Sequence, residues 1–330
     1  MNQTATRWSL PFEKCSGWAI NMLTIGSRGS QLALWQARWI QARLESLDAE
    51  CRIEIIHTTG DKITDVALSK VGTKGLFTKE IEEALLSGAI DLAVHSLKDM
   101  PTELPSGLTL SAIPEREDPR DALVGGRLAD LAQGARVGTS SLRRAAQLRA
   151  IRPDLEIENI RGNVDTRLRK LDQGQYDAII LASAGLRRLG WENRISELLE
   201  PDVMCPAVGQ GALAVETRED SGAAHDLSKR LEHTETRIAV TAERAVLASL
   251  GGGCQVPIGA HATVEKGRMV YIRAVVISPD GTQVIRKEAR GLASDAAAIG
   301  RVLGEQLLAE GGKQILEAVY GAEADPSLRT

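Results

Sequence analysis

The fold is decided by a pattern that occurs twice, SGAIDLA at residues 87–93 and QGQYDAI at residues 173–179. In each copy a glycine ends a helical pattern, and an aspartate stands at the beginning of an apolar run typical of a buried strand. Upstream of each copy, residues 25–28 and 137–140 lead from a strand into a polar turn that opens a helix. The chain therefore contains two similar units in which strands alternate with helices, as in α/β domains with mostly parallel sheets.

A third unit follows these two. The expected helix Glu235–Leu250 leads into LGGGCQVPIG at residues 250–259, and Pro279-Asp280-Gly281 forms a hairpin turn between two later strand-like runs. The three runs expected as strands are residues 261–265, 268–277 and 282–290. We therefore predict two α/β domains that face each other across a cleft, and a small C-terminal α+β domain with a three-stranded antiparallel sheet.

Two stretches mark the crossings between the α/β units. Pro114–Pro119 is polar and bounded by prolines, as a linker would be, and CPAVGQG at residues 205–211 is the expected return crossing. We assign residues 22–115 and 211–232 to a discontinuous domain 1, residues 116–210 to domain 2, and residues 233–330 to domain 3. Residues 1–21 are expected to be a disordered N-terminal extension.

Composition limits the classes of function. The 330 residues have a net charge of −4 and only 3% aromatic side chains, which argues against nucleic-acid binding. No run approaches the roughly 18 apolar residues of a membrane span, and the first 21 residues lack the apolar core of a secretory signal. The four scattered cysteines are typical of a reducing cytoplasm, and the five histidines show no metal-ligand spacing, so we expect no metal site.

The strongest electrostatic feature is the segment from Arg136 to Arg152, which holds five arginines and neither Asp nor Glu. Ser141 is a plausible N-cap, so that free backbone N–H groups would lie beside Arg143 and Arg144 at one helix N-terminus. Such a site can bind carboxylates or phosphates, since the planar guanidinium matches both. The alternatives are a solvated helix face with scattered ion pairs and, less favoured, a nucleic-acid contact.

Two further stretches carry candidate chemistry. Lys98-Asp99 follows a buried strand, where a carboxylate could stabilise a developing cation and move a proton, although a local ion pair before Pro101 is the alternative. Cys254 stands in a glycine-rich stretch that something bulky could approach, although an inert cysteine in a turn is equally compatible with the residues alone. The other three cysteines are expected to serve packing or to lie at the surface.

Six motifs in unbroken order then resemble one family, that of porphobilinogen deaminase, also called hydroxymethylbilane synthase. The resemblance covers roughly residues 23 to 321. Its motifs are IGSRGSQLA (25–33), HSLKD (95–99), GTSSLRR (138–144), RGNV (161–164), PAVGQG (206–211) and GGCQVPIG (252–259). Gly29 departs from the family pattern, which has a longer polar residue there, and residues 1–21 fall outside it.

The resemblance implies two domains like those of type II periplasmic binding proteins, with a third domain that carries the cysteine. It implies a dipyrromethane cofactor joined to Cys254 by a thioether, four successive additions of porphobilinogen with loss of ammonia, and release of hydroxymethylbilane by hydrolysis. Asp99 is implied as the catalytic acid. The residues implied to bind cofactor and substrate are Arg28, Ser30, Ser96, Lys98, Thr139, Ser140, Ser141, Arg143, Arg144, Arg161, Gly162, Asn163, Arg167, Arg188 and Gln210.

The chemistry of these residues agrees with that activity. Each pyrrole brings an acetate and a propionate, so the growing chain becomes strongly anionic and needs many cations. The loop Thr59–Gly75 is expected to cover the cleft. We expect a cytoplasmic monomer whose partner is porphobilinogen, with no nucleic acid and no membrane. The alternatives are a two-domain receptor for a dicarboxylate without chemistry, and a basic nucleic-acid-binding protein.

Overall fold

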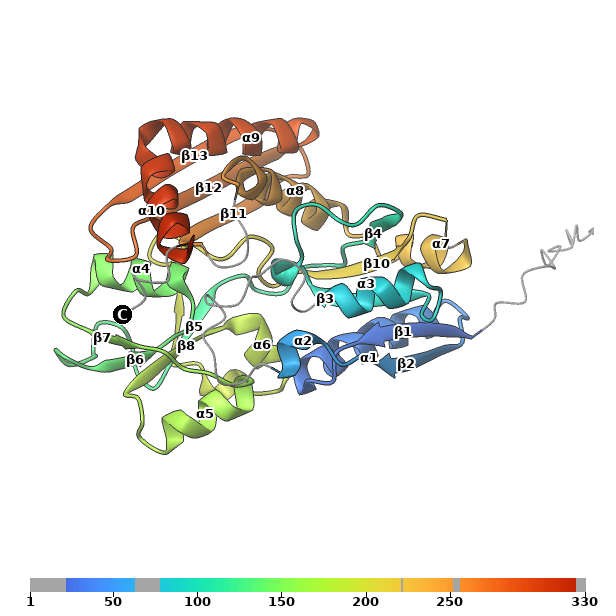
Figure 1. Ribbon diagram of the computed structural model, residues 1–330, viewed down its shortest axis with the longest axis horizontal. Coiled ribbons are helices and arrows are strands. Elements are labelled where there is room, and N and C mark those ends of the chain that lie inside the picture. Colours follow the sequence, from blue (N-terminus) through green and yellow to red (C-terminus); the bar gives the residue numbers. More distant parts are fainter. Residues whose placement is uncertain (1–21, 63–77, 221, 252–255, 325–330) are drawn as a thin grey trace, which may run out of the picture.

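The computed structural model describes residues 22–62, 78–220, 222–251 and 256–324. The predicted extension 1–21, residues 63–75 of the predicted covering loop, and Cys254 lie outside the described residues. Within them, three sheets form three lobes (Figure 1), with five, five and three strands.

The first sheet has the strand order β2-β1-β3-β10-β4. Its strands β1, β2 and β3 are parallel, whereas β10 is antiparallel to both of its neighbours. The strands are β1 (Leu23–Ser27), β2 (Cys51–Ile55), β3 (Leu92–Ser96), β4 (Leu108–Ala112) and β10 (Leu213–Arg218). The helices of this lobe are α1 (Gln31–Glu45), α2 (Thr59–Lys62), α3 (Lys79–Leu86) and α7 (Ala223–Lys229), with a 3-10 turn η2 (Leu97–Asp99) after β3.

The second sheet repeats this plan with the order β7-β6-β8-β5-β9. Here β6, β7 and β8 are parallel and β5 is antiparallel to both neighbours. The strands are β5 (Asp121–Val124), β6 (Arg136–Gly138), β7 (Glu156–Glu158), β8 (Ala178–Ala182) and β9 (Glu197–Leu199). The helices are α4 (Leu142–Ile151), α5 (Val164–Asp172) and α6 (Ser183–Arg188), with a 3-10 turn η3 (Glu192–Arg194).

The two sheets are related position by position, because β1 corresponds to β6 and β3 to β8, as the repeated sequence patterns predict. In each sheet the fourth strand is antiparallel to its neighbours and follows a crossing between the two units. This strand is β10, after the return crossing, in the first sheet, and β5, after the first crossing, in the second. This arrangement confirms the predicted α/β class. Strands β4, β5 and β9 were not predicted, and neither was helix α6 at residues 183–188.

The third lobe has an antiparallel sheet, β11-β12-β13, covered by two long helices. Its elements are α8 (Thr234–Ser249), β11 (Ile258–Glu265), β12 (Met269–Ile277), β13 (Val284–Leu292), η4 (Ala293–Asp295), α9 (Ala296–Leu307), a short π-helical turn η5 (Leu308–Gly312) and α10 (Lys313–Ala324). The predicted hairpin at 279–281 joins β12 to β13, with Gly281 at φ +79°.

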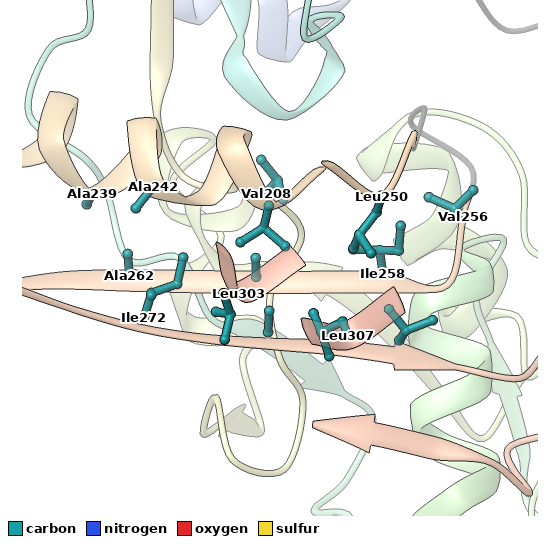
Figure 2. Packing of buried hydrophobic residues seen from close by; sticks show 14 of the residues in the cluster. Val208, Ala239, Ala242, Leu250, Val256, Ile258, Ala262, Ile272, Leu303 and Leu307 are labelled. Atoms are coloured by element: carbon teal, nitrogen blue, oxygen red, sulfur yellow. The ribbon is translucent and has the colours of Figure 1, made fainter. Parts of the chain in front are cut away.

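The core of this lobe takes one residue from the return crossing. Figure 2 shows Val208 beside side chains of α8, such as Ala242, and near Leu250 and Ile258. Burial of such aliphatic side chains contributes about 1.5–3 kcal/mol each. The third lobe is therefore packed on the segment that joins the other two.

Candidate active site

The candidate residues follow the ends of parallel strands in both sheets. Arg28 and Ser30 follow β1, Ser96 ends β3 before Lys98, and Thr139 follows β6. The carboxyl ends of neighbouring parallel strands lie at one edge of a sheet, which is where α/β proteins bind ligands. The repeated topology therefore explains why both halves of the chain contribute loops of the same kind.

Two serines cap the helices that begin at these loops. The Ser30 hydroxyl accepts a hydrogen bond from Ala33 N at 3.3 Å, and the Ser141 hydroxyl accepts one from Arg144 N at 3.5 Å. The first turns of α1 and α4 contain no acidic residue. Both helix N-termini thus retain the partial positive charge that favours an anion. Ser141 was correctly predicted as an N-cap.

Arg143 and Arg144 are turned inward, with 4% and 7% of their surface exposed. This excludes the solvated-helix alternative for these two residues. Their common partner is Asp121, the first residue of β5, which is fully buried. Arg143 Nη1 donates to Asp121 Oδ2 at 2.8 Å, and Arg144 donates to Oδ1 through Nε at 2.9 Å and Nη2 at 2.7 Å.

Gln210 completes this cluster from the return crossing. Its Nε2 donates to Asp121 Oδ1 at 2.9 Å and to Pro119 O at 2.7 Å. The two guanidinium groups hold the pKa of Asp121 well below its usual range, despite burial that acts in the opposite direction. Asp121 is therefore a buried carboxylate that stays ionised. Sequence reasoning missed it, although an aspartate that begins the apolar run DALV was a usable signal.

Lys98 comes from the first sheet but responds to the charges of the second. Burial lowers its pKa, Asp99 and Asp121 raise it, and Arg144 and Arg143 lower it further. The structure thus brings the Lys98 ammonium into the electrostatic range of the arginine pair. Asp99, at the end of η2, is exposed, so its carboxylate is accessible.

The loop before α5 extends the cationic cluster. Arg167 Nε donates to Gly162 O at 2.8 Å, and burial together with the charges of Arg144 and Arg161 lowers the pKa of Arg167 to about 10. Gly162 has φ +107°, and a Cβ there would lie 2.6 Å from Thr166 Cγ2, so only glycine suits this turn. Asn163 is the N-cap residue of α5, but its side chain accepts no capping hydrogen bond.

Arg188 lies apart from this cluster, at the return crossing. Its Nη2 donates to Gly211 O at 2.6 Å, and its guanidinium carbon lies 5.9 Å from the centroid of the Trp35 ring on α1. Burial lowers the pKa of Arg188 to about 10, although Glu117 raises it. Arg188 therefore also serves the contact between α1 and α6.

Several predicted hydroxyls already have partners within the protein. Thr139 Oγ1 accepts from Ser141 N at 3.2 Å, Ser140 Oγ donates to Ile160 O, and Ser96 Oγ accepts from Gln36 Nε2 at 2.9 Å. Gln36 was not predicted, because a glutamine inside an amphipathic helix gives no local signal. Arg28 is half-buried directly after β1.

The third lobe is joined to both crossings by one buried ion pair, which sequence reasoning also missed. Glu243 of α8 accepts from Arg116 Nη1 at 2.6 Å, from Gly209 N at 2.7 Å and from Ala262 N at 2.8 Å. Arg116 Nε in turn donates to Gln210 O at 2.8 Å. The first crossing, the return crossing and the third lobe thus share one carboxylate.

The segment after Cys254 contacts the same return crossing. Ala260 N donates to Pro206 O at 3.0 Å, and a Cβ on Gly259 would lie 2.8 Å from Cys205 O. That carbonyl also accepts from Arg143 Nη1 at 2.6 Å. Gly259, five positions after Cys254 in the sequence, therefore packs against Cys205, whose carbonyl oxygen is bound by Arg143.

In the described part of the chain, no group of three or more His, Cys, Asp or Glu side chains is arranged to hold a metal ion. Over the same residues, no helix has the length and apolar character needed to cross a membrane.

Comparison with known proteins gives two family matches that together span most of the chain. Residues 23–226 match a family described as porphobilinogen deaminase, dipyromethane cofactor binding domain, and residues 237–309 match porphobilinogen deaminase, C-terminal domain. A porphobilinogen deaminase from Syntrophobacter fumaroxidans is 52% identical over 306 residues, which cover 91% of this chain and 99% of the relative. One from Geobacter sulfurreducens is 52% identical over 92% of this chain and 97% of the relative.

Among solved structures, the periplasmic substrate-binding protein of an ABC transporter from Coxiella burnetii is 14% identical. The match covers 68% of this chain and 97% of that one, with a TM-score of 0.40. The assignment of the fold depends on the repeated strand order and not on this likeness.

Proposed function

The chain belongs to the porphobilinogen deaminase family, and on this premise we propose that it joins four porphobilinogen molecules head to tail on a dipyrromethane bound to Cys254. Each addition releases one ammonia, and hydrolysis releases hydroxymethylbilane. The enzyme is a transferase of tetrapyrrole biosynthesis with a dipyrromethane cofactor.

One observation carries the assignment to this site. Cations from both sheets converge: Lys98 from the first, and Arg143, Arg144 and Arg167 from the second. A neutral or singly charged ligand would not need four buried or half-buried cations, because removing a cation from water costs free energy. A chain of pyrroles with two carboxylates on each ring needs several cations to balance its charge.

The donors around the arginine pair suit the acidic side chains of the cofactor. Within the described residues, Nε and Nη2 of Arg143 form no hydrogen bond, so this edge of the guanidinium would be the one to bind a cofactor carboxylate. Arg161 and Arg167 add donors beside it. When bound, the dipyrromethane supplies the terminal pyrrole to which porphobilinogen is joined.

The catalytic role falls to Asp99. Its exposed carboxyl group can donate a proton to the departing amine when it is protonated, and the carboxylate that remains can stabilise the positive charge that develops on a pyrrole nitrogen. Lys98 beside it would bind a substrate carboxylate. The remaining predicted residues, Arg28, Ser30, Ser96, Thr139, Ser140, Ser141, Gly162, Asn163, Arg188 and Gln210, would line or shape the path of the growing chain.

We further propose the boundaries 22–115 with 211–232, 116–210 and 233–330 for the three domains, and a cytoplasmic monomer that binds neither nucleic acid nor membrane. The sheet composition and the acidic net charge of −4 support these proposals. A receptor without chemistry would not need the family's cofactor-binding domain.

Intact-mass spectrometry of the purified full-length chain tests the proposal. We expect a mass excess of one dipyrromethane that disappears in Cys254→Ser and persists in the matched control Cys51→Ser, in which Cys51 lies on β2. An unmodified mass for a chain that consumes porphobilinogen would refute the proposal.

A further inference from the structure

Asp121, the carboxylate that binds both Arg143 and Arg144, was given no catalytic or binding role in the sequence analysis. Asp121 is fully buried and accepts four hydrogen bonds from side chains: one from Arg143, two from Arg144 and one from Gln210. A carboxylate with this many charge-assisted bonds has little freedom to rotate. Its partners are held in equally definite orientations.

The bonds to Asp121 determine which guanidinium edges remain for a ligand. Arg144 directs its Nε and Nη2 edge at Asp121 and gives Nη1 to Ile180 O at 3.1 Å. Among the residues that the structure describes, Arg143 donates through Nη1 alone, to Asp121 Oδ2 and to Cys205 O. Asp121 therefore turns the Nε and Nη2 edge of Arg143 away from the protein's own acceptors.

The same carboxylate sets the charge of the cluster. Two neighbouring guanidinium groups repel each other in a buried environment, and Arg167 and Lys98 add to that repulsion. Asp121 removes one unit of positive charge at the point where the two arginines meet. Its hydrogen bond to Gln210, which also binds Pro119 O, ties the cluster to both crossings.

We propose that Asp121 is a positioning residue for the polymerisation, which fixes the Arg144 guanidinium beside it and orients that of Arg143 so that the Nε and Nη2 edge of Arg143 holds a cofactor or substrate carboxylate in register for bond formation. The proposal rests on the proposed function. It assigns Asp121 no contact with substrate and no proton transfer.

Loss of the Asp121 charge has opposite consequences for binding and for turnover. The site gains one unit of net positive charge, so an anionic substrate binds at least as tightly as before. The two guanidinium groups lose the carboxylate that holds both in fixed orientations, and a misplacement of about 1 Å can cost about 100-fold in rate. A positioning role thus predicts a lower kcat without a higher KM.

The test uses Asp121→Asn in the full-length chain, with Asp177→Asn as a matched control. Asp177 is a half-exposed partner of Arg136 at the opposite end of β6. Dipyrromethane loading by intact mass, the melting temperature, and kcat and KM per loaded enzyme are measured for each. We expect kcat of Asp121→Asn to fall at least about 100-fold with KM no higher than that of wild type, and the control to match wild type.

The other outcomes are also decisive. An Asp121→Asn chain that has a near-native melting temperature but carries no dipyrromethane supports the proposal, because the arginines would then be misdirected before loading. A kcat per loaded enzyme within threefold of wild type overturns it, as does a raised KM with an unchanged kcat.

If Asp121→Asn does not fold, Asp121→Glu is measured in the same way. Glutamate keeps the charge on a longer side chain, so loading and KM should be close to those of wild type while kcat stays well below the wild-type value. Failure of both variants to fold makes Asp121 a folding residue and overturns the proposal. A wild-type chain without dipyrromethane or turnover contradicts the proposed function instead.

Discussion

At the scale of single residues, the two central arginines show how a buried cation is accommodated. The arginine-rich segment from Arg136 to Arg152 predicted an anion site. The sequence did not indicate that Asp121 would accept several of the hydrogen bonds that these two arginines can donate. Burial of an unpaired guanidinium costs several kcal/mol, so a site that must exist before its ligand arrives needs an internal counter-charge. The ligand then adds to this network.

A substitution at Asp99 should lower the rate of turnover without lowering the stability of the fold. Because its side chain is exposed, Asp99→Ala should change the free energy of unfolding by no more than about 0.5 kcal/mol. Loss of a general acid typically costs about 100- to 10,000-fold, so porphobilinogen consumption by the loaded enzyme should fall by at least about 100-fold. A colorimetric assay of porphobilinogen with purified variants checks this.

The control for this experiment is Asp130→Ala, which removes another exposed carboxylate. Its turnover should equal that of wild type. Near-normal turnover in Asp99→Ala would exclude Asp99 as the acid.

At the scale of elements, the predictions that held were those with a local cause. Helix α4 begins after its Ser141 cap and ends before Pro153, as expected from capping and from the restriction on residues before proline. Strands β5 and β9, of four and three residues, were missed, whereas the equally short β6 and β7 were predicted because each leads into a polar turn and a helix. Strands β5 and β9 form only because each finds a partner across the sheet.

The contact between α8 and α9 depends on a glycine in mid-helix. A Cβ on Gly300 would lie 2.1 Å from Ala242 O and 2.9 Å from Ala245 Cβ, so the two helices would have to separate. Alanine normally favours a helix by about 1 kcal/mol over glycine. Here we expect Gly300→Ala to destabilise the protein by about 1–3 kcal/mol, measured by urea unfolding.

Val302→Ala on the exposed face of the same helix is the control, since 48% of the Val302 surface is exposed. Its effect should lie within about 0.5 kcal/mol. A Gly300→Ala variant as stable as wild type would show that α9 can move away from α8 without cost.

At the scale of the whole molecule, the third lobe contacts both elements to which we assign the chemistry. Leu97 and Met100, around the Lys98-Asp99 turn, pack with Val240 of α8. Ala146 of α4 packs with Val275 and Ile277 of β12. The third lobe thus supports both the Lys98-Asp99 turn and the arginine pair, and the Glu243 network joins it to both crossings.

This arrangement predicts that the three lobes unfold in one cooperative transition. It also predicts that this cooperativity depends on Glu243. Removal of one partner from a buried ion pair costs about 3–5 kcal/mol, and Glu243→Gln would leave Arg116 buried without its counter-ion. By scanning calorimetry we expect a lower melting temperature and a transition that divides into two, because the third lobe loses its link to the crossings.

Glu317→Gln, which removes an exposed Lys313 partner on α10, is the matched control and should shift stability by no more than about 1 kcal/mol. A single sharp transition in Glu243→Gln at the wild-type temperature would mean that apolar contacts alone hold the lobes together.

The sequence by itself determined the α/β class, the duplicated topology and the motifs of the family, because helix caps, turns and periodic apolar patterns are properties of neighbouring residues. The meeting of Lys98 with the arginine pair, the burial of those arginines on Asp121 and the junction at Glu243 were decided only by the tertiary structure. These contacts join residues more than twenty positions apart through two crossings, and no local pattern specifies which buried charge will meet its partner there.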